Sequence, residues 1–124
     1  MNLKVLKSRY QIVKLKPDDK LPQNIFDREF YSVTGTEHEL SIVTSENVTV
    51  QSESIENGWK IIKIEGVLDF GLTGILSKIS AVLAHNNISI FVVSTYNTDY
   101  ILVKERFLDK AIAVLTDNGY FFNK

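Results

Sequence analysis

The spacing of hydrophobic residues along this 124-residue chain changes period near its middle. Before Trp59 the apolar residues mostly alternate with polar ones, and a period of two is typical of half-buried β-strands. The very start, MNLKVLKSRYQIVKLK, already alternates in this way. This pattern predicts four strands in the first half, at residues 9–15, 30–33, 39–44 and 47–52. Residues 34–38 suit a hairpin loop.

Two breaks interrupt this strand-rich half. Residues 21–26 are long enough only for a short helix, with Pro22 in its first turn. Residues 56–58, Glu-Asn-Gly, have turn composition and precede another β-rich run at 59–64. We therefore expect a new structural unit to begin there.

A helical period dominates the second half. Six apolar residues recur at i, i+3, i+4 and i+7 spacing and predict a core helix: Leu72, Ile75, Leu76, Ile79, Val82 and Leu83. A β-rich run at 88–96 follows, and a two-residue turn, Asn97-Thr98, separates it from a strand at 99–104. A second amphipathic helix spans 107–115 and ends at Asn118-Gly119, before a last strand at 120–122.

The predicted order from residue 57 onward is therefore βαββαβ. That order defines the α+β ferredoxin-like fold, an antiparallel sheet with both helices on one face. The first half can be interpreted as a degenerate copy whose helices have shrunk. This gives two units, residues 1–56 and 57–124.

The strand at 88–96 has apolar side chains on both of its faces. Ile90 and Val92 point one way, and Phe91 and Val93 point the other. A single helix layer covers only one face of the sheet. The other face must be covered by the first half of the chain, by a second chain, or by both. We expect an oligomer.

Composition narrows the function classes. Apolar residues make up 44% and charged residues 23%, with a net charge of −1 and no cysteine. The near-neutral charge disfavours nucleic-acid binding, and the lack of cysteine excludes disulfides and thiolate chemistry. No apolar run approaches the length of a membrane span. We expect a cytoplasmic protein that binds neither nucleic acid nor membrane.

The segment Asp69-Phe70-Gly71-Leu72-Thr73-Gly74 leads into the predicted core helix. Unpaired N–H groups and the helix dipole favour an anion at such a place. The alternative is an ordinary turn in which Asp69 or Thr73 caps the helix. The loop lacks the spacing of a nucleotide-binding glycine motif.

A second polar cluster comprises Thr95, Tyr96, Asn97 and Asp99. The helix runs antiparallel to the strand at 88–96, so the end of that strand returns towards the glycine loop. Asp99 would then hold a cation near an anion site, which suits a zwitterion. The alternative is a hairpin turn in which Asn97 and Asp99 bond their own backbone.

Catalytic and metal-binding chemistry have little support in the sequence. His38 and His85 have no companion ligands at metal spacing, and no serine has a placed histidine and aspartate. We expect no enzyme activity, no metal and no cofactor.

Several stretches resemble the ACT-domain family: ELSIVTSE, GWKIIKIEGVLDFGLTGILSKISAVLAHNNISIFVVSTYNTDYILVKE and the closing helix. The chain is most similar to small tandem-ACT proteins related to the regulatory domains of aspartate kinase and to cytosolic arginine sensors. The resemblance is strongest over residues 59–120. Gly35 departs from the family pattern, which has arginine there, so the resemblance assigns that loop no role.

The resemblance implies two ACT-like units and a site for a free amino acid at an interface between such units, in a homodimer that regulates another protein. In the family, the loop before the first helix and the strand facing it contact the ligand. The matching positions are Phe70, Gly71, Leu72, Thr73, Gly74, Ile75, Thr95, Tyr96, Asn97 and Asp99. Asp99 matches an acidic position that contacts the ligand in the arginine sensors. A module that only dimerises, without a ligand, is the alternative.

Overall fold

The computed structural model describes residues 1–26, 29–66 and 74–123. The chain forms two compact units. The all-β unit is Lys7–Trp59, and the helical unit combines Met1–Leu6 with Lys60–Lys124. The first six residues thus join the helical unit, whereas the division at residues 56 and 57 placed them in the N-terminal one.

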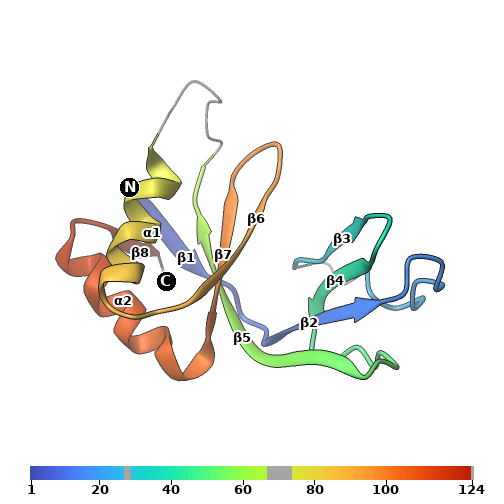
Figure 1. The fold of residues 1–124 in the computed structure, drawn as a ribbon. Coiled ribbons are helices and arrows are strands. Elements are labelled where there is room, and N and C mark those ends of the chain that lie inside the picture. The colour runs from blue at the N-terminus through green and yellow to red at the C-terminus, as the bar shows by residue number, and fades with distance from the viewer. Residues whose placement is uncertain (27–28, 67–73, 124) are drawn as a thin grey trace. The chain divides into compact units, whose positions relative to one another are not determined.

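The helical unit has the order that the hydrophobic periods predict (Figure 1). Its elements are β1 (Asn2–Val5), the last part of β5 (Ser54–Ile64), α1 (Ile75–His85), β6 (Ile90–Ser94), β7 (Asp99–Lys104), the 3-10 helix η1 (Glu105–Phe107), α2 (Leu108–Asp117) and β8 (Phe121–Asn123). From β5 onward this is βαββαβ, so the predicted α+β ferredoxin-like fold is confirmed.

The first strand of the chain lies inside the sheet of the helical unit. The strand order there is β8-β1-β5-β7-β6. β1 pairs antiparallel with β5, Leu3 opposite Ile64, and parallel with β8, Leu3 opposite Phe122. The sequence predicted an antiparallel sheet. The pair β1–β8 differs from this prediction, because β1 is inserted between β5 and β8, antiparallel to the first and parallel to the second.

Both helices pack on one face of this sheet, as Figure 1 shows. Their buried residues share one cluster with strand residues: Leu3, Ile62, Ile64, Ile79, Leu83, Ile88, Ile101, Val103, Ala111 and Leu115. Alternate residues of β5 and β7 point into this cluster, as the strand pleat requires. The predicted core face of α1 is therefore confirmed at its described positions.

Each helix ends in a Schellman motif, in which a residue in the left-handed region lets its own amide and that of the next residue donate to free carbonyls of the last turn. Beyond α1, Asn87 has φ +59°, and the N–H of Ile88 donates to the carbonyl of Leu83 at 3.0 Å. Beyond α2, Gly119 takes this place and the N–H of Tyr120 donates to Leu115 at 3.1 Å. The predicted cap at Asn118-Gly119 is confirmed.

The all-β unit contains β2 (Tyr10–Leu15), β3 (Ser32–Gly35), β4 (Leu40–Ser45) and the first part of β5, in the order β3-β4-β2-β5. All of these pairs are antiparallel. Seven side chains form its core: Val13, Leu15, Ile25, Leu40, Ile42, Val48 and Val50.

Two predicted elements of this unit are wrong. Residues 21–26 form a turn at 23–24, not a helix. Six residues are too few to offset helix nucleation without a strong cap, and Ile25 is instead buried in the core. Residues 47–52 form no strand. Their alternation arises because Val48 and Val50 both insert into the same core.

The predicted turn at residues 56–58 is also wrong, because β5 passes straight through these residues. Trp59 pairs with Tyr10 and Glu56 with Ile12, so β5 uses three residue steps where β2 uses two. This is a β-bulge, and Gly58 accommodates it with φ +79°, a region that side chains disfavour.

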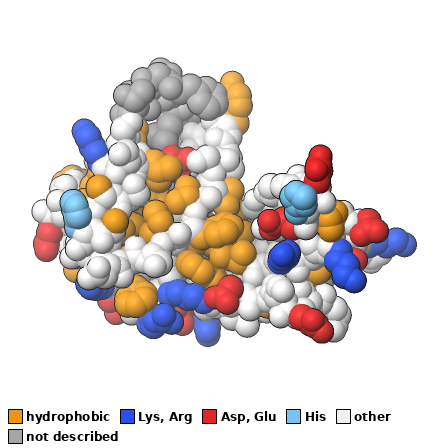
Figure 2. All heavy atoms as spheres, in the orientation of Figure 1, with side chains coloured by type: hydrophobic (Ala, Val, Ile, Leu, Met, Phe, Trp, Pro, Cys, Tyr) orange, Lys and Arg blue, Asp and Glu red, His pale blue; other side chains and the backbone are white. Residues whose placement is uncertain are grey.

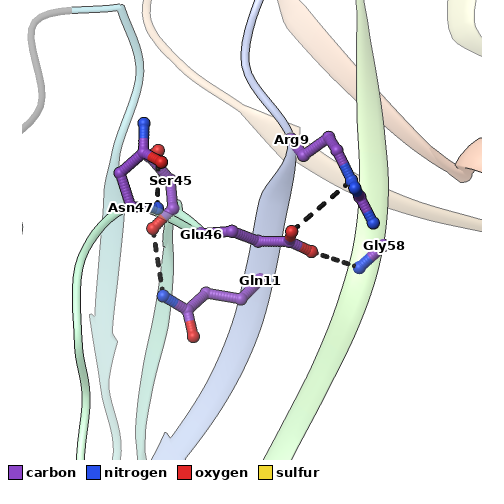
Figure 3. Close-up of polar contacts among 6 residues, drawn as sticks. All are labelled: Arg9, Gln11, Ser45, Glu46, Asn47 and Gly58. Carbon is purple, nitrogen blue, oxygen red and sulfur yellow. Dashed lines mark hydrogen bonds and ion pairs between the residues drawn. The ribbon is translucent and has the colours of Figure 1, made fainter.

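A carboxylate holds the bulge in place (Figure 3). The Glu46 side chain accepts a 2.6 Å hydrogen bond from the N–H of Gly58, and its other oxygen lies 3.4 Å from Nε of Arg9. Nearby, the buried Gln11 amide donates to the carbonyls of Ser45 and Val48. Backbone N–H and carbonyl groups that make no hydrogen bond within the strand ladder are thus bonded to side chains.

A second carboxylate fastens the start of the all-β unit. Glu29 accepts hydrogen bonds from the N–H groups of Lys7 (2.8 Å) and Ser8 (3.0 Å) and from the buried hydroxyl of Tyr10 (2.6 Å). Burial raises the pKa of Glu29, but the hydrogen bonds from Tyr10, Lys7 and Ser8 together outweigh it and hold the pKa below its ordinary value.

We predict that Glu29→Gln lowers the free energy of unfolding at pH 7 by about 1 to 2 kcal/mol, since the partly exposed carboxylate accepts three bonds. A depressed folded-state pKa stabilises the protein above the unfolded-state pKa, roughly pH 4.3. This stability is lost as the pH falls through the folded-state pKa. Urea denaturation between pH 7 and pH 3 measures both effects. The exposed Glu37→Gln is the control, and an equal loss in both variants would contradict the role of Glu29.

Candidate functional site

The structure describes about half of the predicted ligand-binding residues. Those described are Gly74, Ile75, Thr95, Tyr96, Asn97 and Asp99. Asp69, Phe70, Gly71, Leu72 and Thr73 lie outside the described residues. The described part of the predicted site therefore comprises the first turn of α1 and the turn between β6 and β7.

α1 begins at Ile75, and the residue before it, Gly74, occupies the N-cap position with φ +82°. Glycine has no side chain to accept a hydrogen bond from the first amides of the helix. The first turn also contains no acidic residue. The positive end of the α1 dipole is thus not neutralised by its own N-cap residue or first turn, which suits an anionic group.

The turn between β6 and β7 differs from the predicted one by a residue. Ser94 pairs with Asp99, and the N–H of Thr95 donates to the carbonyl of Thr98 at 2.9 Å. Tyr96 and Asn97 therefore form the tip, not Asn97 and Thr98. The Tyr96 side chain is 81% exposed.

Thr98 anchors this turn, and sequence reasoning missed it. It is 3% exposed, and its hydroxyl donates a 2.7 Å hydrogen bond to the carbonyl of Ile64 at the end of β5. The turn is therefore fixed beside the last residue of β5. A threonine among other polar turn residues carries no sequence signal for such a contact.

The two halves of the site lie at the same end of the helical unit (Figure 1). α1 has 11 residues and β6 has five, so at about 1.5 Å and 3.3 Å per residue both are roughly 16 Å long. A tight reversal at Asn86 and Asn87 joins them, and β6 returns to the level of the first turn of α1.

Asp99 lies on the face of the sheet that the helices cover. Its ladder position matches that of Ile101 and Val103, whose side chains are in the core beneath α1 and α2. The side chain is half-buried. Among the described residues, no basic side chain is within ion-pair distance of its carboxylate.

Nearby charges on the opposite face are already paired. The Lys63 ammonium lies 3.6 Å from a Glu65 oxygen and 6.0 Å from the ring centre of Tyr100. In the described part of the chain, no three His, Asp or Glu side chains are grouped closely enough to hold a metal ion. The described helices also include none that is long and apolar enough to cross a membrane.

Comparison with models of known families assigns the chain to one of them. The model of the ACT domain matches residues 54–117, just over half of the chain. The chain belongs to the ACT-domain family. A second family model, that of an N-terminal domain, matches residues 8–52 within the all-β unit.

The chain is also similar to individual proteins. Protein Atu0741 from Agrobacterium tumefaciens is 34% identical with a TM-score of 0.90, over 98% of this chain and 91% of that one. Human CASTOR3P is 31% identical over 63% of this chain. The match spans 56% of the length of that human protein.

Aspartokinase alpha and beta subunits have the same fold. The TM-score is 0.66 at 17% identity, and the match covers 94% of this chain and 96% of that chain. At this identity the likeness concerns the fold alone. The expected structural relation to aspartate kinase is confirmed at that level.

We predict that Thr98→Val lowers the free energy of unfolding by about 1 to 3 kcal/mol, because it leaves the buried carbonyl of Ile64 without its hydroxyl donor. Thr49→Val, at an exposed position, is the matched control and should change it by less than about 0.5 kcal/mol. Urea denaturation of both variants measures the difference. Equal stability of the two variants would show that the Thr98 bond does not hold the turn.

Proposed function

We propose that this protein is a non-catalytic regulatory module that binds a free amino acid at the end of the helical unit. The carboxylate of Asp99 carries this proposal, because it is half-buried on the helix-covered face and has no basic side chain within ion-pair distance among residues 1–26, 29–66 and 74–123. It stands at the same end as the first turn of α1, whose N-cap residue is a glycine and makes no side-chain cap bond. A negative group and a positive helix end at one place match the opposite charges of a zwitterion.

In this proposal the ligand carboxylate accepts hydrogen bonds from the first amides of α1 and from the loop before it, and Asp99 binds the cationic group. Thr95, Tyr96 and Asn97 line the opposite side. The loop residues complete the site: Asp69, Phe70, Gly71, Leu72, Thr73, Gly74 and Ile75. The exposed ring of Tyr96 is positioned to cover a ligand or to contact a second ACT unit.

Membership of the ACT family supports a regulatory role, and the fold shared with aspartokinase subunits is consistent with it. We further propose a cytoplasmic homodimer whose ligand site lies at an interface between ACT units. The ligand would change the affinity for a regulated protein partner by binding one arrangement of the units better than another.

We predict that Asp99→Asn weakens amino-acid binding about 10-fold to 100-fold, the loss expected for a charge-assisted hydrogen bond. Thermal shift with a panel of free amino acids at millimolar concentration identifies the ligand, and calorimetry then compares the variants. The exposed Asp117→Asn is the control. The proposal fails if ligand-free protein shows no shift with any amino acid.

A purely structural dimerisation module is the second candidate, and the edge strand β6 favours it. Among the described strands β6 pairs only with β7, and its sequence, IFVVS, has no charge to protect the open edge. Phe91 and Val93 point away from the helices and are half-buried.

We predict that Val93→Lys shifts a β6-mediated dimer towards monomer, because a charge on an edge strand opposes strand pairing. Val33→Lys, on the edge strand β3 of the all-β unit, is the matched control. Sedimentation velocity over a concentration series measures the shift. A dimer unaffected by Val93→Lys rules out this edge, and a dimer that needs no ligand favours the structural module.

A further inference from the structure

We propose a second small-molecule site, in the all-β unit, that binds a small molecule carrying a carboxylate or phosphate group. It is a hollow of about 420 Å³ at the end of β2. This volume falls in the range of pockets that hold small ligands. The hollow lies wholly within Lys7–Trp59, so it does not depend on the site proposed for the helical unit.

The strand order of the all-β unit creates the hollow. β2 lies between β4 and β5, and it ends where both neighbours begin, with Leu15 opposite Leu40 and Lys14 opposite Ser54. Three segments therefore meet at this edge of the sheet: the residues after β2, those before β4 and those before β5. The lining residues with polar side chains include Lys14, Lys16, Asp19, His38, Ser52 and Glu53.

Each of these walls is ordered by its own hydrogen bonds. The Asp19 carboxylate accepts a 2.9 Å bond from the N–H of Lys16. The Ser52 hydroxyl donates to the carbonyl of Lys14 at 2.7 Å and accepts from the N–H of Ser54 at 3.0 Å. The hydroxyl of Thr36 likewise accepts from the N–H of His38 at 3.1 Å. The hollow is thus preformed, which reduces the entropy lost on binding.

The hollow is lined by two lysines and by two carboxylates, those of Asp19 and Glu53, so its formal charges balance and the proposed preference for an anion rests on which of these groups are already engaged. Within residues 1–26, 29–66 and 74–123, the ammonium groups of Lys14 and Lys16 have no hydrogen bond or ion pair. Asp19, by contrast, is already engaged with a backbone amide. Figure 2 shows basic and acidic side chains close together over the loop that follows β2. Two lysines with His38 can bind a carboxylate or phosphate, and Glu53 can bind a hydroxyl or amine on the same molecule.

A second hollow adjoins the first and extends the space for a ligand. It has a volume of about 350 Å³ and shares Leu15, Asp19 and Gln51 with the first. Its other lining residues include Lys20 and Val50. A ligand longer than a simple anion can therefore continue along the loop that follows β2.

The test is a titration of the ¹⁵N-labelled full chain, monitored by NMR, with inorganic phosphate and separately with citrate, at ionic strength held constant with sodium chloride. We expect saturable shifts at the amides of His38, Ser52 and Ser54. Lys16→Ala should raise the dissociation constant about 10-fold, as for the loss of a charge-assisted hydrogen bond. Lys110→Ala, at an exposed position of α2, should leave it unchanged.

The anion whose titration saturates identifies the chemical group. If neither phosphate nor citrate binds, the proposal is overturned. Shifts that do not saturate, or that spread over the lysines of both units, show screening only and also overturn it. If Lys16→Ala has no effect and the double variant Lys14→Ala with Lys16→Ala has none either, the lysines do not form a site. Asp99→Asn should leave this binding unchanged, which separates it from the amino-acid site.

Discussion

The pairing of the first strand with β5 is the constraint on which the helical unit depends. Leu3 pairs with Ile64, and the N–H of Glu65 donates to the carbonyl of Asn2 at 2.9 Å. Ile64 also has its side chain in the core, and its carbonyl accepts the Thr98 hydroxyl. One residue thus connects the inserted strand, the hydrophobic core and the turn that carries Asp99. Backbone groups at the end of β5 are satisfied only if the chain's first residues return to it.

The acidic side chains of this protein differ in the hydrogen-bond donors that their carboxylate oxygens bind. Glu29 and Glu46 take backbone N–H groups that no strand ladder uses, so their charge stabilises the fold. Asp19 orders a turn in the same way. Asp99, by contrast, is half-buried and has no basic partner among the described residues. In the proposed function, the cationic group of the ligand supplies that partner.

Local patterns were sufficient where one period ran for many residues. The 3.6-residue spacing of Ile75, Ile79 and Val82, and the β-branched runs on either side, predicted βαββαβ because each element buries one continuous face. They failed where short segments fill a core without regular structure. Ile25, Val48 and Val50 look periodic, but each simply inserts into the same apolar cluster. Gly58 is in a sequence typical of turns, but it lies at a β-bulge because this part of β5 pairs with β2.

The sequence by itself determined the elements of the helical unit from residue 57 onward, the C-terminal cap of α2 and the polar residues at the end of β6, since these depend on neighbours a few positions away. Only the tertiary structure decided that β1 lies between β5 and β8, that Thr98 anchors the turn, and that Lys14, Lys16 and His38 surround one hollow. Each of these joins segments far apart in the chain. Strand pairing between such segments is set by the burial of a whole sheet face and the satisfaction of its backbone groups, which no local pattern encodes.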